Sequence, residues 1–432
     1  MAPNPNVHAP TPGDAARATT AAAPFNQFFR LIAGQTAMLF AGFATAQGCA
    51  FLRNAIFANV LSRGDFGVAA LILLTLQMIE TLAELGADRL IIQADDGASD
   101  AVVGTAQCFQ LIRGVATGVL LIALAIPMAE FYGIPDAAPA FMAIALAPLM
   151  RGFINLDIRR AQRALNNRPY IVVEVLPQIL ALIATPIALM YSPTFAAVVI
   201  VAVVQSGATL LVSHLMSSRP MRTAWDVSVA WRMLAFAWPI WASALPLIAV
   251  YHGDRVLIGR LIDMEAVAGY SAAFLITMVP GLIAAKVGNA MLLPLLSSVK
   301  ADRAQFRTRL RAMIVVVSAV AALYVIGFAL LGGPLLAFAF GPEYEGLGLV
   351  VLLLAVSWGL RMLQVVPGMA LMAIGRTQTL FTAGCIRALG LVGVFAVISG
   401  GYGIAGVAGV AAIAELASLA FVSYRTRRLT AA

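Results

Sequence analysis

The sequence predicts an all-α integral membrane protein with about twelve transmembrane helices, six in each half of the chain. Three observations support this fold class. Of the 432 residues, 61% are hydrophobic and 11% are charged, whereas about a quarter of the residues in soluble domains are charged. The apolar stretches run without interruption for roughly twenty residues, the length of a membrane-spanning helix, and lack the alternation of a barrel strand. The basic residues concentrate in the short connections between these stretches.

Hydropathy along the chain separates the predicted spans, six in each half. The connections between them are short, so we expect no soluble domain to be inserted between two spans. The spans are predicted at residues 31–58, 66–87, 104–128, 137–156, 170–191, 194–216, 232–253, 267–296, 312–336, 346–373, 379–399 and 403–424.

These spans divide the chain into two lobes with short cytoplasmic segments. Residues 1–27 are rich in Ala, Pro and Thr and lack a compact apolar core, which predicts a disordered tail. The expected order is a tail at 1–27, an N-terminal lobe at 28–217, a cytoplasmic linker at 218–231, a C-terminal lobe at 232–425 and a second tail at 426–432.

Lys and Arg accumulate at every second connection, and this pattern predicts the orientation in the membrane. Because cytoplasmic connections carry an excess of basic residues, we expect both termini in the cytoplasm. The net charge of +8 is then a consequence of topology and of attraction to lipid headgroups, and no nucleic acid partner is expected. The basic residues placed on the cytoplasmic side are Arg159, Arg160, Arg163, Arg168, Arg219, Arg222, Arg232, Lys300, Arg303, Arg307, Arg309, Arg311, Arg425, Arg427 and Arg428.

The two halves of the sequence show weak internal similarity. The segment "LRNAIFANVLSRGDFGVAA" (52–70) is similar to "GDRVLIGRLIDMEAVAGYSAA" (253–273), with Leu61 matching Leu261. Both halves have six predicted spans and enter the membrane from the same side, so the repeat is parallel. Repeats of this kind place a substrate site between the halves, near the middle of the membrane.

Residues that commonly perform catalysis or bind metals are few and scattered. The three cysteines, Cys49, Cys108 and Cys385, all lie within apolar stretches, and the three histidines are far apart in the sequence. We therefore expect no disulfide, no metal site and no thiol nucleophile. The chain also lacks a GxxxxGK[ST] loop, which argues against ATP hydrolysis. Neither an enzyme nor a bound cofactor is expected.

Three stretches of the sequence resemble a known family. They are "LSRGDFG" (61–67) after a span that contains an arginine, "DRVLIGRLIDMEAVAGYSAA" (254–273) followed by "MLLPLLSSVKADR" (291–303), and "FGPEYEGLGLVVLLLA" (340–355). In order, spacing and span count the chain resembles the polysaccharide-biosynthesis family, the O-antigen and exopolysaccharide flippases of the multidrug/oligosaccharidyl-lipid/polysaccharide exporter superfamily. The resemblance covers about residues 28–425.

This resemblance implies a fold and a function that the composition alone does not. It implies two six-helix lobes related by a parallel pseudo-twofold repeat, around a V-shaped central cavity that works by alternating access. It also implies a polyprenyl-pyrophosphate-linked oligosaccharide as substrate, moved from the cytoplasmic to the periplasmic leaflet of a bacterial inner membrane. Membrane lipid and the polysaccharide polymerase machinery are the implied partners.

Several arginines lie inside predicted spans, where a charged side chain costs at least about 2.5–3.5 kcal/mol and usually faces a cavity or a partner. Arg53 and Arg255 occupy nearly equivalent positions in the two halves. Because a guanidinium forms bidentate hydrogen bonds to phosphate oxygens, we predict that Arg53 and Arg255 face each other across the cavity and bind the pyrophosphate. Arg113, Arg361 and Arg387 are predicted to extend this cationic lining. For each arginine the alternative is a structural ion pair or a side chain that reaches the headgroups.

Other ionisable residues of the spans leave two interpretations open. Asp254 either orients the neighbouring arginine or binds a coupling cation. Glu80 and Glu84 lie one helical turn apart, so either one of them is protonated or both pair with arginines. Lys286 and Arg151 lie nearer the cytoplasmic ends, where a long side chain can reach the headgroups.

The predicted function is flipping of a lipid-linked oligosaccharide without ATP. A pyrophosphate with two negative charges that leaves an inside-negative cell gains roughly 4–5 kcal/mol per 100 mV, so the membrane potential can drive transport; ion antiport remains an alternative. A cation-coupled multidrug exporter of the same superfamily is the nearest other function, although it is expected to have carboxylates in its cavity. A polysaccharide polymerase or ligase is less favoured, because no predicted external loop is large.

Overall fold

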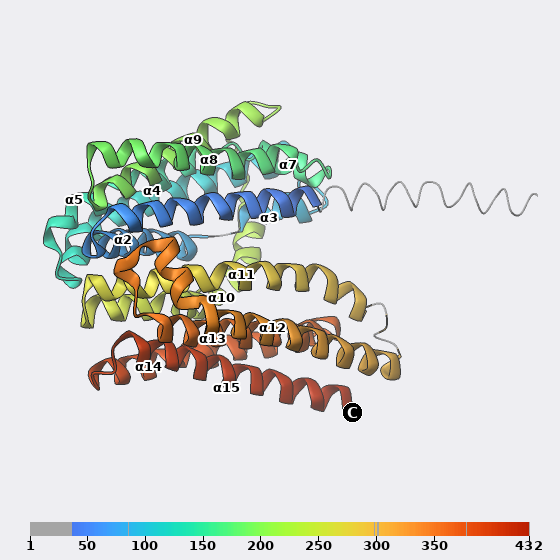
Figure 1. Cartoon of the computed structure of the whole chain (residues 1–432). Helices are drawn as coiled ribbons and strands as arrows, with labels where there is room; N and C mark the ends of the chain where they lie inside the picture. Colours follow the sequence, from blue (N-terminus) through green and yellow to red (C-terminus); the bar gives the residue numbers. More distant parts are fainter. Residues whose placement is uncertain (1–36, 85, 298, 300–301, 377, 432) are drawn as a thin grey trace, which may run out of the picture.

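The protein is a bundle of helices whose two lobes lie one above the other in Figure 1. The computed structural model describes residues 37–431 apart from residues 85, 298, 300–301 and 377, and every regular element in this part of the chain is helical. The predicted tail at 1–27 lies outside the described residues. The all-α membrane fold is therefore confirmed.

The N-terminal lobe contains the helix of residues 37–60, α2 (Arg63–Leu82), α3 (Ala87–Gln93), α4 (Asp100–Phe131), η1 (Pro135–Ala137), α5 (Ala138–Ala143), α6 (Leu146–Gly152), α7 (Asp157–Arg163), α8 (Arg168–Tyr191) and α9 (Phe195–Met216). The C-terminal lobe contains α10 (Val227–Leu261), α11 (Met264–Ser297), α12 (Arg303–Phe340), η2 (Pro342–Tyr344), α13 (Gly348–Ala373), α14 (Gln378–Ser399) and α15 (Gly403–Ala431). An extended segment at 217–226 joins the lobes.

Each predicted span coincides with a helix or a helix pair, although the bounds differ. Among the described residues, length and hydropathy single out nine helices as able to cross a membrane, or ten if one bent pair is counted as a span. The helix of residues 37–60 and α10 lie where the first and seventh spans were predicted. Several helices in the C-terminal lobe exceed the predicted spans. For example, α12 has 38 residues and begins at Arg303, because Asp302 caps its first turn by accepting hydrogen bonds from two backbone N–H groups.

The fourth predicted span, residues 137–156, is not one continuous helix. It is divided into α5 and α6, and the helices of Pro135–Gly152 are bent by 55° against α7. Proline has no N–H group, so Pro148 cannot donate to the carbonyl of Ile144. The N–H of Ala147 donates to that carbonyl instead, at 3.0 Å, and the helix tightens and breaks there.

The lobes pack against each other where α2 and α11 begin, at the left of Figure 1, and we call this the closed end. The side chain of Asn59 donates from Nδ2 to the carbonyl of Ala339 at 2.9 Å. Arg63 donates to the carbonyls of Glu343 and Glu265, at 3.4 and 3.5 Å. These hydrogen bonds all join the N-terminal lobe to the C-terminal lobe.

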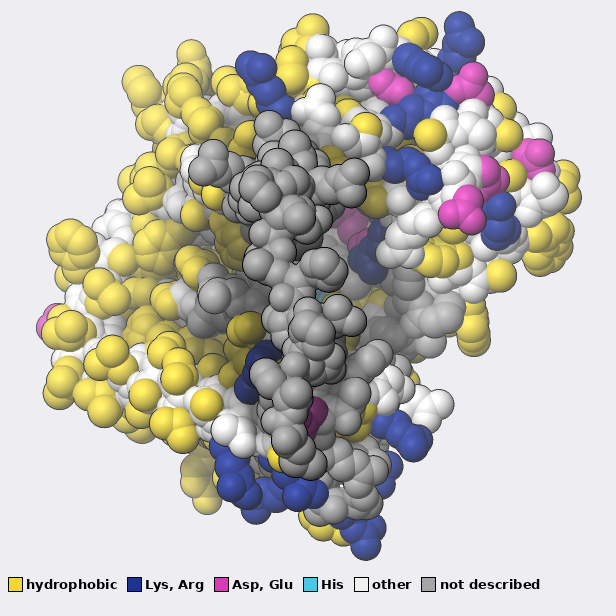
Figure 2. Space-filling model, turned by 90° about the vertical axis from the view of Figure 1, so that its right-hand side faces the viewer, with side chains coloured by type: hydrophobic (Ala, Val, Ile, Leu, Met, Phe, Trp, Pro, Cys, Tyr) yellow, Lys and Arg dark blue, Asp and Glu magenta, His cyan; other side chains and the backbone are white. Residues whose placement is uncertain are grey.

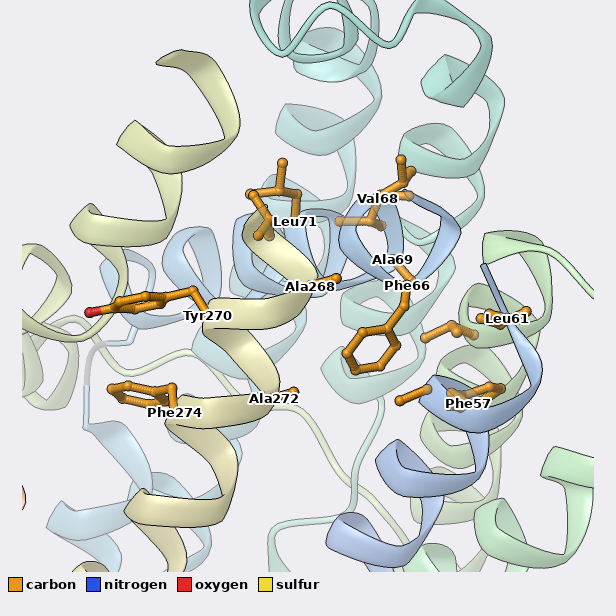
Figure 3. Packing of buried hydrophobic residues seen from close by; sticks show 14 of the residues in the cluster. Phe57, Leu61, Phe66, Val68, Ala69, Leu71, Ala268, Tyr270, Ala272 and Phe274 are labelled. Carbon is orange, nitrogen blue, oxygen red and sulfur yellow. The ribbon is translucent and has the colours of Figure 1, made fainter. Parts of the chain in front are cut away.

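A continuous apolar core lies beneath these hydrogen bonds and includes residues of both lobes. Figure 3 shows Ala268 and Ala272 on the side of α11 that faces α2, while Tyr270 and Phe274 project from the opposite side. The small side chains let the two backbones come close together: a Cβ atom on Gly67 would lie 1.9 Å from the carbonyl oxygen of Met264. The lobes are therefore in backbone contact at the closed end.

The opposite end of the bundle, at the right of Figure 1, carries α7 and the described C-terminus, and we call it the basic end. Figure 2 faces this end and shows Lys and Arg side chains gathered on it. Here the first turns of α10 pack on α3 and α4, through Val229, Met233 and Leu90. Arg232 of α10 also forms an ion pair with Asp96, at 2.8 Å, in the loop between α3 and α4. The first helix of the C-terminal lobe is thus attached to the N-terminal lobe at the basic end.

Candidate functional site

A polar cavity of about 260 Å³ lies inside the N-terminal lobe, and we call it the N-lobe cavity. It is bounded by the helix of residues 37–60, α2, α6 and α9. Its volume is several times the roughly 30 Å³ that a water molecule occupies in the liquid, so a small charged group fits. Its polar lining consists of Arg53, Asn54, Gln77, Glu80, Arg151 and Gln205.

Arg53 is held in this cavity by two neutral side chains from different helices. Its Nη1 atom donates to Oε1 of Gln178 on α8, at 3.0 Å, and to Oε1 of Gln205 on α9, at 2.7 Å. These are the hydrogen bonds of the Arg53 side chain among the described residues, and both use the same nitrogen. The Nε and Nη2 edge of the guanidinium is left without a protein acceptor in that part of the chain.

A second arginine lines the same cavity and is paired with a carboxylate. Arg151 lies in the last turn of α6, and its Nη1 atom is 2.6 Å from Oε2 of Glu80 on α2. Both side chains are partly exposed to the cavity. The guanidinium groups of Arg53 and Arg151 and the carboxylate of Glu80 together give the N-lobe cavity a net positive charge. Such a cavity can bind an anion such as a phosphate group.

The C-terminal lobe contains a buried ion cluster around Glu415 of α15. Arg361 of α13 donates from Nε to Oε1 of Glu415 at 2.8 Å and also contacts that oxygen through Nη2. Nη1 of Arg387 on α14 lies 3.6 Å from Oε2 of Glu415. The adjoining cavity, of about 50 Å³, has room for a few waters. This arrangement agrees with the alternative of structural pairing for Arg361 and Arg387.

Arg255 also contacts only groups of its own lobe among the described residues. Its guanidinium lies 4.5 Å from the ring centroid of Phe274, its Nε atom is 3.8 Å from Oδ1 of Asp254, and it donates to the carbonyl of Tyr251. The predicted pair of Arg53 and Arg255 facing each other is therefore not found in this structure. The reason is that the rotation of each helix about its axis directs Arg53 into the N-terminal lobe and Arg255 into the C-terminal lobe.

The remaining predicted residues lie near the basic end or outside the described side chains. Arg113 lines another cavity of the N-terminal lobe, also of about 260 Å³, together with Glu84, Asp88 and Glu174. In the described part of the chain Arg113 makes no hydrogen bond or ion pair. Glu84 pairs with Arg89 at 3.0 Å on the surface. The side chain of Lys286 lies outside the described residues.

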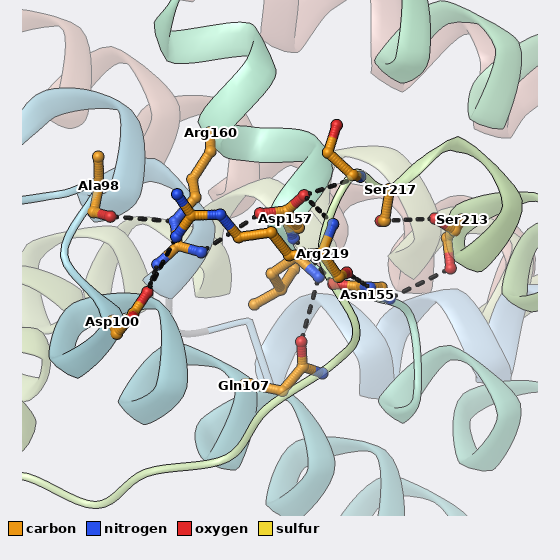
Figure 4. A network of polar contacts seen from close by, with 11 residues as sticks. Ala98, Asp100, Gln107, Asn155, Asp157, Arg160, Ser213, Ser217 and Arg219 are labelled. Carbon is orange, nitrogen blue, oxygen red and sulfur yellow. Dashed lines mark hydrogen bonds and ion pairs between the residues drawn. The ribbon is translucent and has the colours of Figure 1, made fainter.

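A network of hydrogen bonds at the basic end attaches the extended segment at 217–226 to the N-terminal lobe (Figure 4). Asp157 of α7 accepts hydrogen bonds from the backbone N–H groups of Ser218 and Arg219, both at 3.0 Å. Asn155 donates to the carbonyl of Arg219 at 2.9 Å. The side chains of Arg160 and Arg219 also form ion pairs with Asp100, at 2.5 and 3.3 Å. Because these two charges are already compensated, the N-lobe cavity is the better candidate site.

The fold is similar to that of solved transporters. The inward-facing conformation of a multidrug resistance MATE family transporter of the MOP superfamily has a TM-score of 0.73 and 15% identity, with 89% of this chain and 95% of that chain covered. Lipid II flippase MurJ, in its inward closed conformation, has a TM-score of 0.71 and 15% identity, with 90% and 87% covered. A MOP superfamily transporter from Pyrococcus furiosus has a TM-score of 0.59 and 15% identity, with 92% and 96% covered. Curated protein sequences give no match.

The chain thus has the fold of these transporters, two lobes of membrane-spanning helices, and polar cavities lie inside its lobes. The family described as "Polysaccharide biosynthesis protein" matches residues 56–347, which is more than half of the chain. The chain belongs to this family, as the sequence motifs indicated.

The polar residues around Arg53 were not predicted to take part in its site. Arg151 was interpreted as a headgroup contact, and Gln178 and Gln205 were not considered. A signal was present, because a glutamine inside an apolar span is itself costly and usually faces a partner. Formal charge alone does not indicate such amides, because they are neutral.

Proposed function

We propose that this protein is a flippase that moves a polyprenyl-pyrophosphate-linked oligosaccharide from the cytoplasmic to the periplasmic leaflet of a bacterial inner membrane. The family to which the chain belongs supports a polysaccharide precursor as substrate. The diphosphate enters the N-lobe cavity, while the prenyl tail remains in the surrounding lipid. Export then supplies the polysaccharide polymerase machinery on the outer face.

The observation that carries this proposal is the open edge of Arg53 in the N-lobe cavity. Its charge has no carboxylate partner among the described residues, and Arg151 lines the same cavity. Arginine is well suited to phosphate because its planar guanidinium donates two parallel hydrogen bonds. The diphosphate therefore binds Arg53 and Arg151, both in the N-terminal lobe, instead of the predicted pair of Arg53 and Arg255.

Alternating access is supported by the packing between the lobes. The lobes are in backbone contact at the closed end through Gly67 and Met264, and hydrogen bonds of Asn59 and Arg63 cross the same interface. The fold is also more similar to the inward-facing MATE transporter than to the outward-facing one, with TM-scores of 0.73 and 0.59. The described conformation then corresponds to the state that is closed toward the periplasm.

The orientation follows from the charges at the two ends. The basic end contains the arginines of α7, the segment at 217–226 and the end of α15. The positive-inside rule places this end in the cytoplasm, together with both termini. The domain limits proposed from the sequence are consistent with the extended segment at 217–226 between the lobes. Outward movement of two negative charges then releases energy in an inside-negative cell.

A cation-coupled multidrug exporter is the second candidate function. It is favoured by the similarity in fold to MATE transporters and by the buried carboxylates Asp254 and Glu415 in the C-terminal lobe. The arginines near these carboxylates argue against it, because they already compensate the negative charge. Transport of a cationic dye by purified protein, with no flipping of a lipid-linked sugar, would support this candidate.

The experiment that tests the proposed function measures flipping in proteoliposomes that contain a fluorescent polyprenyl-diphosphate-linked sugar. The double substitution Arg53→Ala and Arg151→Ala is expected to abolish flipping while the protein still inserts and remains folded. Arg89→Ala is the control, because Arg89 is a half-exposed arginine that pairs with Glu84 outside the N-lobe cavity. Normal flipping by the double variant would disprove this site.

A further inference from the structure

Arg53 differs in the kind of partner that holds it from the span arginines that pair with a glutamate. Arg151 pairs with Glu80, Arg361 pairs with Glu415, and Arg387 lies near the same carboxylate. Arg53 is held by two amide oxygens, from Gln178 and Gln205. An amide oxygen accepts a hydrogen bond without cancelling the charge of the donor.

A carboxylate at either position would hold the guanidinium more strongly, since hydrogen bonds between ionised groups are about twice as strong as neutral ones. The same protein uses carboxylates for this purpose elsewhere, at Glu80 and Glu415. If the role of these contacts were only to keep Arg53 in place, glutamate would serve better than glutamine. Because both acceptors are neutral, the positive charge of Arg53 remains in the N-lobe cavity, whereas a carboxylate partner would cancel it.

The geometry of the contact also matters. Both glutamines accept from Nη1, so one corner of the guanidinium is attached to α8 and α9 at once. The Nε and Nη2 atoms have no hydrogen-bond acceptor in the described part of the chain. This edge has the two parallel donors that a phosphate group accepts from.

We propose that Gln178 and Gln205 are positioning residues that hold Arg53 by one nitrogen, leave its charge uncompensated and leave its Nε and Nη2 edge to a diphosphate. This inference rests on the proposed function, since it assumes that Arg53 contacts the substrate. The glutamines themselves act through Arg53. Their neutrality determines how strongly the cavity binds an anion.

The test replaces each glutamine by an acid of the same shape. In Gln178→Glu and Gln205→Glu the contact with Arg53 is retained and strengthened, but the charge of Arg53 is cancelled. Farnesyl diphosphate, a short prenyl diphosphate, is the binding probe, and binding to detergent-purified protein is measured by calorimetry. Farnesol and inorganic pyrophosphate show whether the lipid or the diphosphate provides the affinity.

Each acidic variant is expected to lose at least about tenfold in affinity for farnesyl diphosphate, with thermal stability equal to or above that of the wild type. A role in stability alone predicts unchanged binding, so the two quantities separate the explanations. Gln162→Glu is the matched control, because Oε1 of Gln162 accepts from Arg159 at 2.9 Å outside the N-lobe cavity. This control is expected to bind the probe as the wild type does.

The failure of this inference can be distinguished from the failure of the proposed function. If Gln178→Glu and Gln205→Glu bind the probe normally while Arg53→Ala does not, the glutamines are not positioning residues, although the site stands. If Arg53→Ala binds and flips normally, the N-lobe cavity is not the substrate site and both proposals are wrong. A fall in stability that accompanies the loss of binding in the acidic variants would also contradict the inference.

Discussion

Replacing Gly67 by alanine is expected to favour a conformation in which the two lobes are separated at the closed end. Gly67 lies in the second turn of α2 and faces the first residue of α11, Met264, across the interface between the lobes. The atom that an added Cβ would meet is a backbone carbonyl oxygen, which cannot rotate away as a side chain can. The lobes must therefore move apart at this point.

The size of the movement follows from the distances. An added Cβ would lie 1.9 Å from the Met264 oxygen, and ordinary contact begins at 3.4 Å, so the backbones are too close by 1.5 Å. Overpacking of this kind typically costs about 1–3 kcal/mol. If separation of the lobes relieves the overlap, the equilibrium between joined and separated lobes shifts by about 5- to 150-fold toward the conformation in which they are separated at the closed end.

Electron paramagnetic resonance can measure this shift as a distance across the closed end. Spin labels are attached to cysteines introduced at Tyr191, which ends α8, and Tyr402, which precedes α15; both side chains are largely exposed. The background variant lacks the native cysteines. Gly67→Ala is expected to increase the population with a long distance between the labels.

Gly64→Ala provides the control for this measurement. Gly64 lies in the same helix, and an added Cβ there would meet nothing closer than 3.9 Å. This variant should keep the distance distribution of the background protein. If Gly67→Ala also kept that distribution and the same thermal stability, the closed end would not depend on backbone contact between α2 and α11, and the reasoning would be refuted.

Two further predictions concern charged residues outside the N-lobe cavity. Glu415→Ala is expected to lower the thermal stability strongly, by about 3–5 kcal/mol, because Arg361 and Arg387 would lose their carboxylate; a Tm equal to that of the wild type would show that the cluster is solvated. At the basic end, a hydrogen bond from Arg232 lowers the pKa of Asp96. The ion pair of Asp96 therefore stabilises the fold above the ordinary aspartate pKa, and this stabilisation is lost as the pH falls through the lowered pKa of Asp96. The difference in Tm between wild type and Asp96→Asn should therefore vanish at acidic pH, and a difference that persists there would contradict the ion pair.

Much of the fold could be predicted from the sequence, because a span of about twenty apolar residues has few alternatives to a membrane helix. Hydropathy placed each predicted span on a helix or a helix pair, whereas the family and its two-lobe arrangement were identified from the resemblance of the sequence motifs. The prediction was less accurate where local chemistry alters a helix. Pro148 divides the fourth span, and the polar first turns of α12 extend the helix beyond the apolar stretch.

The candidate site could be predicted only in part. Arg53 was identified as a costly charge within a span, and the structure places it in a cavity. Its partners were not identified, because Gln178 and Gln205 are more than a hundred residues away along the chain. Similarly, the equivalence of Arg53 and Arg255 in the repeat gave no information on the direction of either side chain.

The sequence by itself determined which segments cross the membrane, because transfer of apolar residues into lipid depends mainly on composition. Only the tertiary structure decided which arginines share a cavity. Helices in a bilayer are apolar on the sides that face lipid and also on the sides that face other helices, so hydropathy does not reveal how each helix is rotated. That rotation directs Arg53 toward Gln178 and Gln205, and it directs Arg361 toward Glu415.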